Sequence, residues 1–270
     1  MKSTETSPRP EWKRVIGILG GLGPHAHIEF EILLLSATEK TLGRQLADQD
    51  YPPWVLSSMP TTPDRTTALL DQTESPVDAL VRSAERVSAA DFAVIPCNTA
   101  HAFLAEVRER TDLPFLDMIQ ATAEQVVEDV GPRGTVGILA ASGTLKSGLY
   151  ADRVRALAPG VRLISPLDLG GGAELQRRLV MEPIFGEQGI KAGAFRNPER
   201  REQLAEPMRE AARRLADAGA QVVLTACTEI PLVVGRDAVD AIPLLDPMAV
   251  AAERAIAIAL GRRRLPGEPS

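Results

Sequence analysis

The chain has 270 residues, and its 30 Lys and Arg residues against 36 Asp and Glu give a formal net charge of -6. A mildly acidic chain lacks the basic footprint of proteins that bind nucleic acid or an anionic membrane surface, so we expect neither partner. Hydrophobic residues make up 44% of the chain and charged residues 24%, which excludes a disordered protein. The length favours one large domain or two small ones.

The two cysteines, Cys97 and Cys227, lie far apart in the sequence. They form no disulfide framework and suit a reducing compartment, so we expect a cytoplasmic protein. With three histidines and no Cys-x-x-Cys pair, we expect no metal site. The polar N-terminal stretch lacks the apolar centre of a signal peptide, and no long uncharged apolar run predicts a transmembrane helix.

Short apolar runs alternate with longer amphipathic stretches along the chain, which predicts parallel strands covered by helices on both faces. We expect the ends, 1–13 and 263–270, to be disordered. A glycine-rich turn at 20–24 separates the first strand from the first helix. The predicted strands are 15–19, 54–58, 92–96, 114–117, 135–140, 161–166, 221–226 and 242–246, and the clearest helices are 76–88, 100–110 and 199–219.

Three short segments recur in the same order. Residues 17–21 match 137–141 at an offset of 120, 94–99 match 224–229 at 130, and 113–117 match 242–246 at 129. Constant order and nearly constant offset predict two similar α/β halves. The larger offset of the later matches predicts extra residues in the second half, within either 170–172 or 183–198.

This repeat changes the interpretation of the cysteines, which are otherwise expected to be small buried hydrophobes. Cys97 and Cys227 each follow a predicted central strand, one in each half. Ligands of open α/β sheets bind outside the carboxyl ends of the strands, and a following helix start lowers a thiol pKa. The sequence therefore predicts two thiols that face each other across a cleft between two pseudo-symmetric parallel-sheet α/β domains.

Four motifs in this order resemble the aspartate/glutamate racemase family, and its aspartate racemase branch in particular. The resemblance runs from about residue 14 to residue 262. Glutamate racemases usually carry His where this chain has Glu229, which favours the aspartate branch. The motifs are Gly20-Gly21-Leu22-Gly23-Pro24, Pro63-Asp64-Arg65-Thr66, Pro96-Cys97-Asn98-Thr99-Ala100-His101 and Cys227-Thr228-Glu229-Ile230-Pro231.

The resemblance implies a cofactor-independent amino-acid racemase that acts on aspartate or a related acidic amino acid, with Cys97 and Cys227 as its two bases. Racemisation needs an acid and a base on opposite faces of Cα, and donors that stabilise charge on the α-carboxylate. The family also implies a homodimer. The expected domains are 14–118 with 246–262, because the C-terminal segment returns as a helix, and 119–245.

Substrate contacts are expected from residues beside the thiols. Arg65 suits a carboxylate because its guanidinium binds in a bidentate manner, and Lys191, in an Ile-Lys-x-Gly segment, is its expected partner on the distal carboxylate. Either could instead be a surface cation. The glycines at 20–24 do not form a dinucleotide fingerprint. We expect them instead to let the backbone turn tightly beside the substrate. The expected substrate-binding set is Gly21, Arg65, Asn98, Thr99, Lys191, Thr228 and Glu229.

Four residues have two interpretations each. His25 and His27 are expected at a solvent-facing helix start, and the alternative is that one faces the pocket. His101 either orients the Cys97 loop or makes a purely structural hydrogen bond. Glu229 either tunes Cys227 or caps the next helix, and the sequence favours the cap.

The rivals within the same superfamily are a glutamate racemase, a hydantoin racemase, a maleate isomerase and an arylmalonate-decarboxylase-like enzyme. Two cysteines favour racemisation over decarboxylation, which needs one proton donor, but a maleate isomerase uses one as a nucleophile. A different class is a non-catalytic binding protein that kept the cleft. A pyridoxal-phosphate enzyme is a third rival, in which Lys191 forms the Schiff base.

Overall fold

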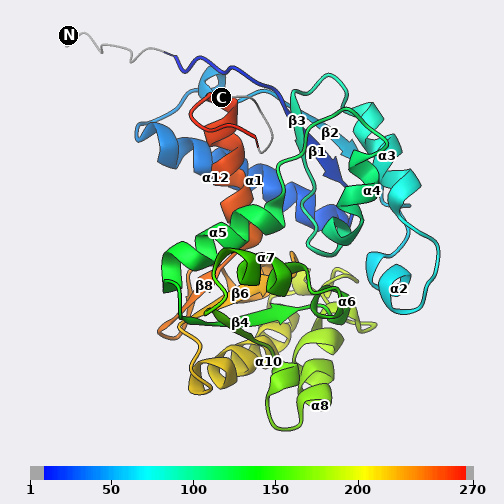
Figure 1. Ribbon diagram of the computed structural model, residues 1–270, viewed down its shortest axis with the longest axis vertical. Helices are drawn as coiled ribbons and strands as arrows, with labels where there is room; N and C mark the ends of the chain where they lie inside the picture. Colours follow the sequence, from blue (N-terminus) through cyan, green and yellow to red (C-terminus); the bar gives the residue numbers. More distant parts are fainter. Residues whose placement is uncertain (1–8, 266–270) are drawn as a thin grey trace.

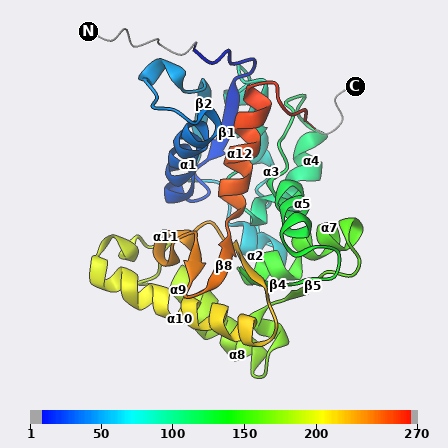
Figure 2. The same ribbon diagram turned by 90° about the vertical axis from the view of Figure 1, so that its left-hand side faces the viewer.

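The computed structural model describes residues 9–265, which fold into two α/β halves stacked along the long axis of the molecule (Figures 1 and 2). The first half begins with a buried strand and a glycine-rich turn, as predicted. Its elements are β1 (Ile16–Gly20), α1 (Pro24–Leu42), β2 (Trp54–Ser58), α2 (Arg65–Leu70), α3 (Val77–Arg86), β3 (Phe92–Val94), a 3-10 turn (Thr99–Phe103), α4 (Leu104–Arg108) and α5 (Met118–Val130).

The second half repeats this plan with more short helices. Its extra length lies between β5 and α10, a longer connection than residues 59–76 of the first half, and it contains both segments predicted to hold the additional residues. The elements are β4 (Thr135–Ala140), α6 (Ser142–Lys146), α7 (Leu149–Leu157), β5 (Arg162–Ile164), α8 (Gly172–Gln176), a π-helical turn (Arg177–Met181), α9 (Glu182–Phe185), α10 (Pro198–Asp217), β6 (Val222–Ala226), α11 (Pro231–Val234), β7 (Ala238–Val239), β8 (Ile242–Leu245) and α12 (Pro247–Ala259).

The strand order confirms two pseudo-symmetric halves. The first sheet runs β2-β1-β3 and the second β5-β4-β6-β8-β7, and every pair is parallel except the β7–β8 hairpin. The predicted strand at 114–117 is reduced to one parallel bridge between Phe115 and Ala93, at the position that β8 holds in the second sheet. The alternation and the repeat in the sequence therefore predicted correctly that the strands are parallel. They did not predict the antiparallel pair of β7 and β8 at the edge of the second sheet.

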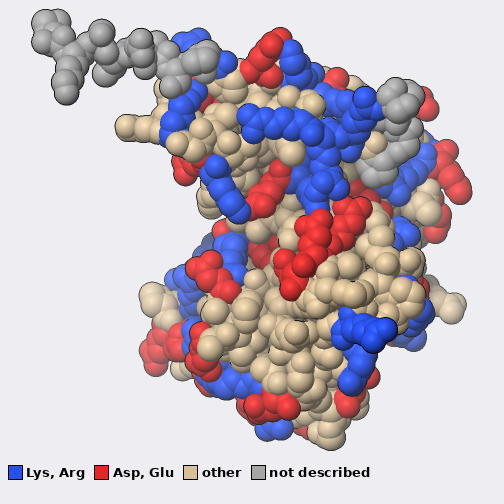
Figure 3. Space-filling model, turned by 60° about the vertical axis from the view of Figure 1, so that its left-hand side comes forward, with Lys and Arg blue, Asp and Glu red and all other residues tan. Residues whose placement is uncertain are grey.

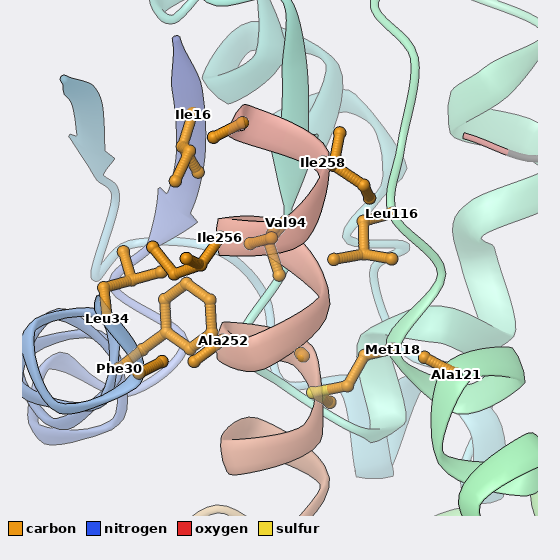
Figure 4. Packing of buried hydrophobic residues seen from close by; sticks show 14 of the residues in the cluster. Ile16, Phe30, Leu34, Val94, Leu116, Met118, Ala121, Ala252, Ile256 and Ile258 are labelled. Carbon is orange, nitrogen blue, oxygen red and sulfur yellow. The ribbon is translucent and has the colours of Figure 1, made fainter. Parts of the chain in front are cut away.

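Helix α12 packs among α1, α5 and the first sheet (Figure 4). Phe30 and Leu34 of α1 meet Ala252 and Ile256 of α12, and all four are buried. Helix α5 joins the halves, because Met118 belongs to this core. Ile119, Ala123 and Val126 on another face of α5 belong to the core around β4 and β6. The last helix of the chain thus completes the first core.

The expected disordered ends fall mostly on residues 1–8 and 266–270, which lie outside the described residues. Within the described part the expectation is wrong at two points. The backbone N–H of Lys13 donates to the carbonyl of Ala259 at 2.8 Å, and Leu265 is buried in the first core. Leu265 packs because it is the one large apolar residue in a charged segment.

Within residues 9–265, no helix is both long and apolar enough to cross a membrane. The same range holds no group of three His, Cys, Asp or Glu side chains arranged to bind a metal ion. On the face drawn in Figure 3, basic and acidic side chains are interspersed, so that face carries charges of both signs.

Candidate active site

Cys97 and Cys227 line one small cavity between the two halves. Cys97 follows β3 and Cys227 follows β6, and each is more than nine-tenths buried. We call this space the thiol cavity. It measures about 20 Å³, which is room for about one water molecule. Most of the predicted site residues share it. Its lining is Leu22, Asp64, Arg65, Thr66, Cys97, Asn98, Thr99, Ala141, Phe185, Lys191, Cys227, Thr228 and Glu229.

A larger cavity of about 280 Å³ adjoins the first and shares Asp64, Arg65, Lys191 and Glu229 with it. We call this second space the vestibule. Gly21 and His25 line it rather than the thiol cavity. The closed thiol cavity is too small for an amino acid, so a ligand that reaches both thiols must widen the cleft from the vestibule side.

Glu229 contacts the Cys227 thiol instead of capping a helix, which corrects the favoured expectation. The thiol donates to Glu229 Oε2 at 3.1 Å, and the Thr228 hydroxyl donates to the same oxygen at 3.0 Å. Lys191 Nζ lies 3.1 Å from Glu229 Oε1 and 5.2 Å from the centre of the Phe185 ring. Helix α11 has no side-chain cap. The carboxylate therefore connects the lysine to the thiol.

The charges in this group set the proton on Cys227. Burial and the neighbouring Glu229 carboxylate raise the pKa of the Cys227 thiol well above its ordinary value. Burial opposes ionisation of Glu229, yet its pKa is lowered because Lys191 and the Cys227 and Thr228 donors stabilise the carboxylate. Burial likewise opposes the charge on Lys191, but Glu229, Cys227 and Cys97 together outweigh it, so the pKa of the lysine is raised. Cys227 is thus held as a thiol beside an ion pair.

We expect Glu229→Gln to make Cys227 more reactive. The amide keeps the shape but removes the charge that raises the pKa of the thiol, and it leaves Lys191 facing Cys227. In a Cys97→Ser background, alkylation of Cys227 by iodoacetamide at neutral pH should accelerate about tenfold, the effect of one pKa unit. Peptide mass spectrometry measures the rate. An unchanged or slower rate contradicts this role. The alkylation rate of Cys97, measured in a Cys227→Ser background, provides the matched comparison.

Arg65 is buried at the start of α2, so the surface-cation alternative is excluded for it. Its guanidinium donates to the carbonyls of Leu22 at 2.6 Å and Pro63 at 3.1 Å. Burial lowers the pKa of an arginine, but Cys97, Asp64 and Glu229 face Arg65 and raise its pKa above the ordinary value. The positive charge next to Cys97 contrasts with the carboxylate next to Cys227.

Two buried donor atoms on the cavity lining have no hydrogen-bond partner among the described residues: Arg65 Nε and Asn98 Nδ2. A buried donor left unpaired costs about 1–3 kcal/mol. An anionic ligand group that reaches these two atoms would satisfy both donors. We therefore regard these two atoms as the strongest sign of what the cavity binds.

The side chains that follow Cys97 are held by the opposite half of the molecule. The Tyr150 hydroxyl donates to Asn98 Oδ1, and Thr144 Oγ1 lies 2.8 Å from Thr99 Oγ1. Burial raises the pKa of Tyr150 well above its ordinary value, so the phenol remains a donor. The sequence pattern indicated neither partner, although Tyr150 is one of only two tyrosines in the chain. Ala141 was not predicted either, although its match to Gly21 in the repeat was a usable signal.

His101 lies behind the Cys97 loop and does not line the cavity. Its Nε2 accepts from the backbone N–H of Met118 at 3.3 Å, so Nδ1 carries the proton and donates to the Cys97 carbonyl at 2.9 Å. His101 therefore orients the loop through its backbone. His27 is buried too, and its Nδ1 accepts from the Gly21 N–H at 3.0 Å. The solvent-facing expectation is wrong for His27, because the tight glycine turn needs an acceptor.

His25 is half-buried at the vestibule. Its ring stands edge-on to Phe195, with centroids 5.0 Å apart, and its Nε2 lies 3.2 Å from Arg196 Nη2. Both partners belong to the segment that follows Lys191. His25 thus contacts the second half at the mouth of the cleft.

Burial lowers the pKa of both His27 and His101, which makes the fold sensitive to mild acid. Below about pH 6.5 the unfolded chain binds protons that the native histidines refuse. Stability should therefore fall with pH, by up to about 1.4 kcal/mol per pH unit for each histidine. Urea unfolding between about pH 7 and pH 5 measures the slope. His27→Gln and His101→Gln should each reduce this slope below that of the wild type, and a wild-type slope in both variants contradicts the assignment.

Gly21 is required by its backbone. Its φ is +90°, and an added Cβ would lie 2.4 Å from the backbone nitrogen of Met59. We expect Gly21→Ala to lower the free energy of unfolding by about 2–4 kcal/mol, from backbone strain and overpacking. Gly170→Ala is the control, since nothing lies within 4 Å of a Cβ there. Equal losses in the two variants, measured by urea unfolding, would refute this.

The family model described as Asp/Glu/Hydantoin racemase matches residues 19–255, most of the chain. The chain belongs to this racemase family. An aspartate racemase from Picrophilus torridus shares the fold at a TM-score of 0.73 and 25% identity, over 93% of this chain and 96% of that one.

Two relatives match over shorter stretches. The glutamate racemase of Deinococcus radiodurans is 33% identical over 145 residues, 53% of this chain and 43% of the relative. The broad specificity amino-acid racemase RacX of Bacillus subtilis is 28% identical over 138 residues, 50% of this chain and 58% of the relative. The matched part therefore spans about half the length of these curated relatives. Their names support a racemase-type activity for the family and differ in substrate.

Proposed function

We propose that this protein is an amino-acid racemase that acts on aspartate or a related acidic amino acid. The observation that carries the proposal is the pairing of two thiols in one cavity with two unpaired buried donors, Arg65 Nε and Asn98 Nδ2. Membership of the family and the likeness to the Picrophilus torridus aspartate racemase support it.

In this scheme the thiolate of one cysteine removes the Cα proton and the thiol of the other returns a proton to the opposite face. Cys227 begins as the acid, because Glu229 accepts its hydrogen bond and raises its pKa. Cys97, which lines the same cavity, then serves as the base. In the reverse direction the roles exchange. The two thiols supply all the proton transfers that inversion needs, so the scheme requires no cofactor.

Negative charge develops on the α-carboxylate when the proton leaves. Preorganised donors that face this charge lower the barrier most. Asn98 is a suitable donor because Tyr150 fixes its Oδ1 and leaves Nδ2 without a protein partner. Arg65 is suited to the distal carboxylate, since three backbone carbonyls fix its position. Lys191 binds the same distal carboxylate once the substrate competes with Glu229 for the ammonium group of Lys191.

The test is a panel of single enantiomers of aspartate, glutamate and neutral and basic amino acids, incubated with reduced protein and resolved by chiral chromatography. We expect both enantiomers of aspartate or glutamate to converge on an equal mixture, at rates that hydroxylamine, a trap for pyridoxal phosphate, does not change. Racemisation confined to neutral or basic amino acids would contradict the acidic substrate, and no racemisation at all would contradict the activity. Sedimentation measures the expected homodimer separately.

A further inference from the structure

A third cavity, of about 510 Å³, lies at the carboxyl ends of β4 and β5. None of its lining residues lines the thiol cavity. The floor is apolar, and Leu70 from the end of α2 brings the first half into its wall. We call it the β4–β5 cavity. Its apolar lining includes Leu70, Ile138, Leu145, Leu163 and Leu167.

The position and size of the β4–β5 cavity are those of a small-molecule site. Parallel α/β sheets bind ligands at the carboxyl ends of their strands, and ligand pockets commonly measure 300–1,000 Å³, roughly the range in which this one falls. Leu167, on its edge, is 47% exposed. An apolar ligand body would cover it.

Opposite charges mark the exposed rim of this cavity. Lys146 and Asp168 both line it and both are exposed, and Ser142 adds a hydroxyl group. The N–H and hydroxyl of Ser165 donate to Asp168 Oδ2 at 2.8 Å and 2.7 Å, which leaves Oδ1 of this carboxylate to accept from a ligand. A free α-amino acid carries a carboxylate for the lysine, an ammonium for the aspartate, and a side chain for the apolar floor. The complementary chemistry is therefore a zwitterion with a large apolar side chain, such as leucine or phenylalanine.

Three connections lead from the β4–β5 cavity to the Cys97 loop. Tyr150 lines the cavity and donates to Asn98. Thr144 lines it and bonds Thr99. Helix α2 begins with Arg65 in the thiol cavity and ends with Leu70 in this one, and it packs against α6. A ligand here touches the groups that hold Asn98 and Thr99 in place.

We propose that the β4–β5 cavity binds a free amino acid with a large apolar side chain and that this binding changes the reactivity of Cys97. The ligand bridges Leu70 of the first half and α6, α7 and β5 of the second, so it favours one arrangement of the cleft over another. The coupling acts through Tyr150 and Thr144.

Binding is tested by calorimetry with L-leucine and L-phenylalanine on the Cys227→Ser protein, which cannot racemise them under the proposed scheme. We expect both to bind, and Lys146→Ala to weaken binding about tenfold or more through loss of a charge-assisted hydrogen bond. Ala151→Phe, which fills the cavity, should abolish binding. Lys40→Ala, an exposed lysine elsewhere, should change nothing. No heat from either amino acid, or equal binding by Lys146→Ala and wild type, overturns the site.

Coupling is tested by the iodoacetamide alkylation rate of Cys97 in the same Cys227→Ser protein, with and without saturating leucine. We expect leucine to change this rate at least about fivefold, the lower end of ordinary allosteric coupling. Tyr150→Phe should bind leucine but lose most of the change in rate. A ligand that binds without altering Cys97 would overturn the regulation. Neither the calorimetric binding nor the alkylation rate depends on turnover. A failure of this proposal is therefore distinguishable from a failure of the proposed racemase activity.

Discussion

Alanine in place of Cys97 or Cys227 is expected to lower the racemisation rate by about 10²–10⁴-fold, the usual contribution of a general acid or base. Each thiol serves one face of Cα, so neither can replace the other. Each single variant should still remove the α-proton from one enantiomer, and the two variants should act on opposite enantiomers. Chiral chromatography and NMR of the α-proton measure both effects.

Both cysteines are buried, so the folded state of these variants must be checked by circular dichroism and by thermal unfolding. The change removes one sulfur atom next to a small cavity, and we expect the fold to persist. Serine variants, which keep a hydroxyl at each position, provide a second pair. A variant that keeps the wild-type rate of racemisation with either cysteine gone would contradict the two-base scheme.

Arg65→Ala is expected to lower kcat/KM by about 10²–10³-fold, because it removes a buried charged partner of a substrate carboxylate. It also leaves the carbonyls of Leu22 and Pro63 without their donor, so the free energy of unfolding should fall by about 2–4 kcal/mol. Arg65→Lys keeps the charge but cannot reach all these carbonyls, and we expect it to recover less than a tenth of the lost activity.

The control is Arg133→Ala, which removes an exposed arginine at the far end of β4. It should leave kcat/KM and stability unchanged. Steady-state kinetics and urea unfolding separate the two effects of Arg65, since a stability loss with wild-type kcat/KM would make it a structural residue only. That result would also remove the support for a bound distal carboxylate.

The sequence predicted the parallel strands well, because buried parallel strands are continuous apolar runs between helices. The strand at 135–140 is matched at both ends by β4, and 54–58 by β2. The internal repeat predicted two similar halves, and the sheets share the matching orders β2-β1-β3 and β5-β4-β6. Two features were not predicted. The β7–β8 hairpin is too short to show alternation, and the predicted helix at 100–110 begins with a 3-10 turn.

The site was predicted only in part, since motifs identify residues but not their partners. Cys97 and Cys227 were expected to share a cavity, and they do. Glu229 was expected to cap a helix, but it accepts from the Cys227 thiol and pairs with Lys191, a residue distant in sequence. Tyr150 reaches Asn98 across 52 positions of sequence, a contact that follows from the packing of the two halves rather than from any local pattern.

The central claim, that two thiols on opposite faces invert Cα, is tested most directly by the early time course of deuterium incorporation. Reduced protein is incubated in D2O with one enantiomer of aspartate, and both enantiomers are separated and analysed by mass spectrometry before equilibrium. Two bases predict that the product carries deuterium at Cα while the remaining substrate keeps its proton. Product that retains the substrate's proton, or deuterium that enters both enantiomers equally from the start, would contradict the account.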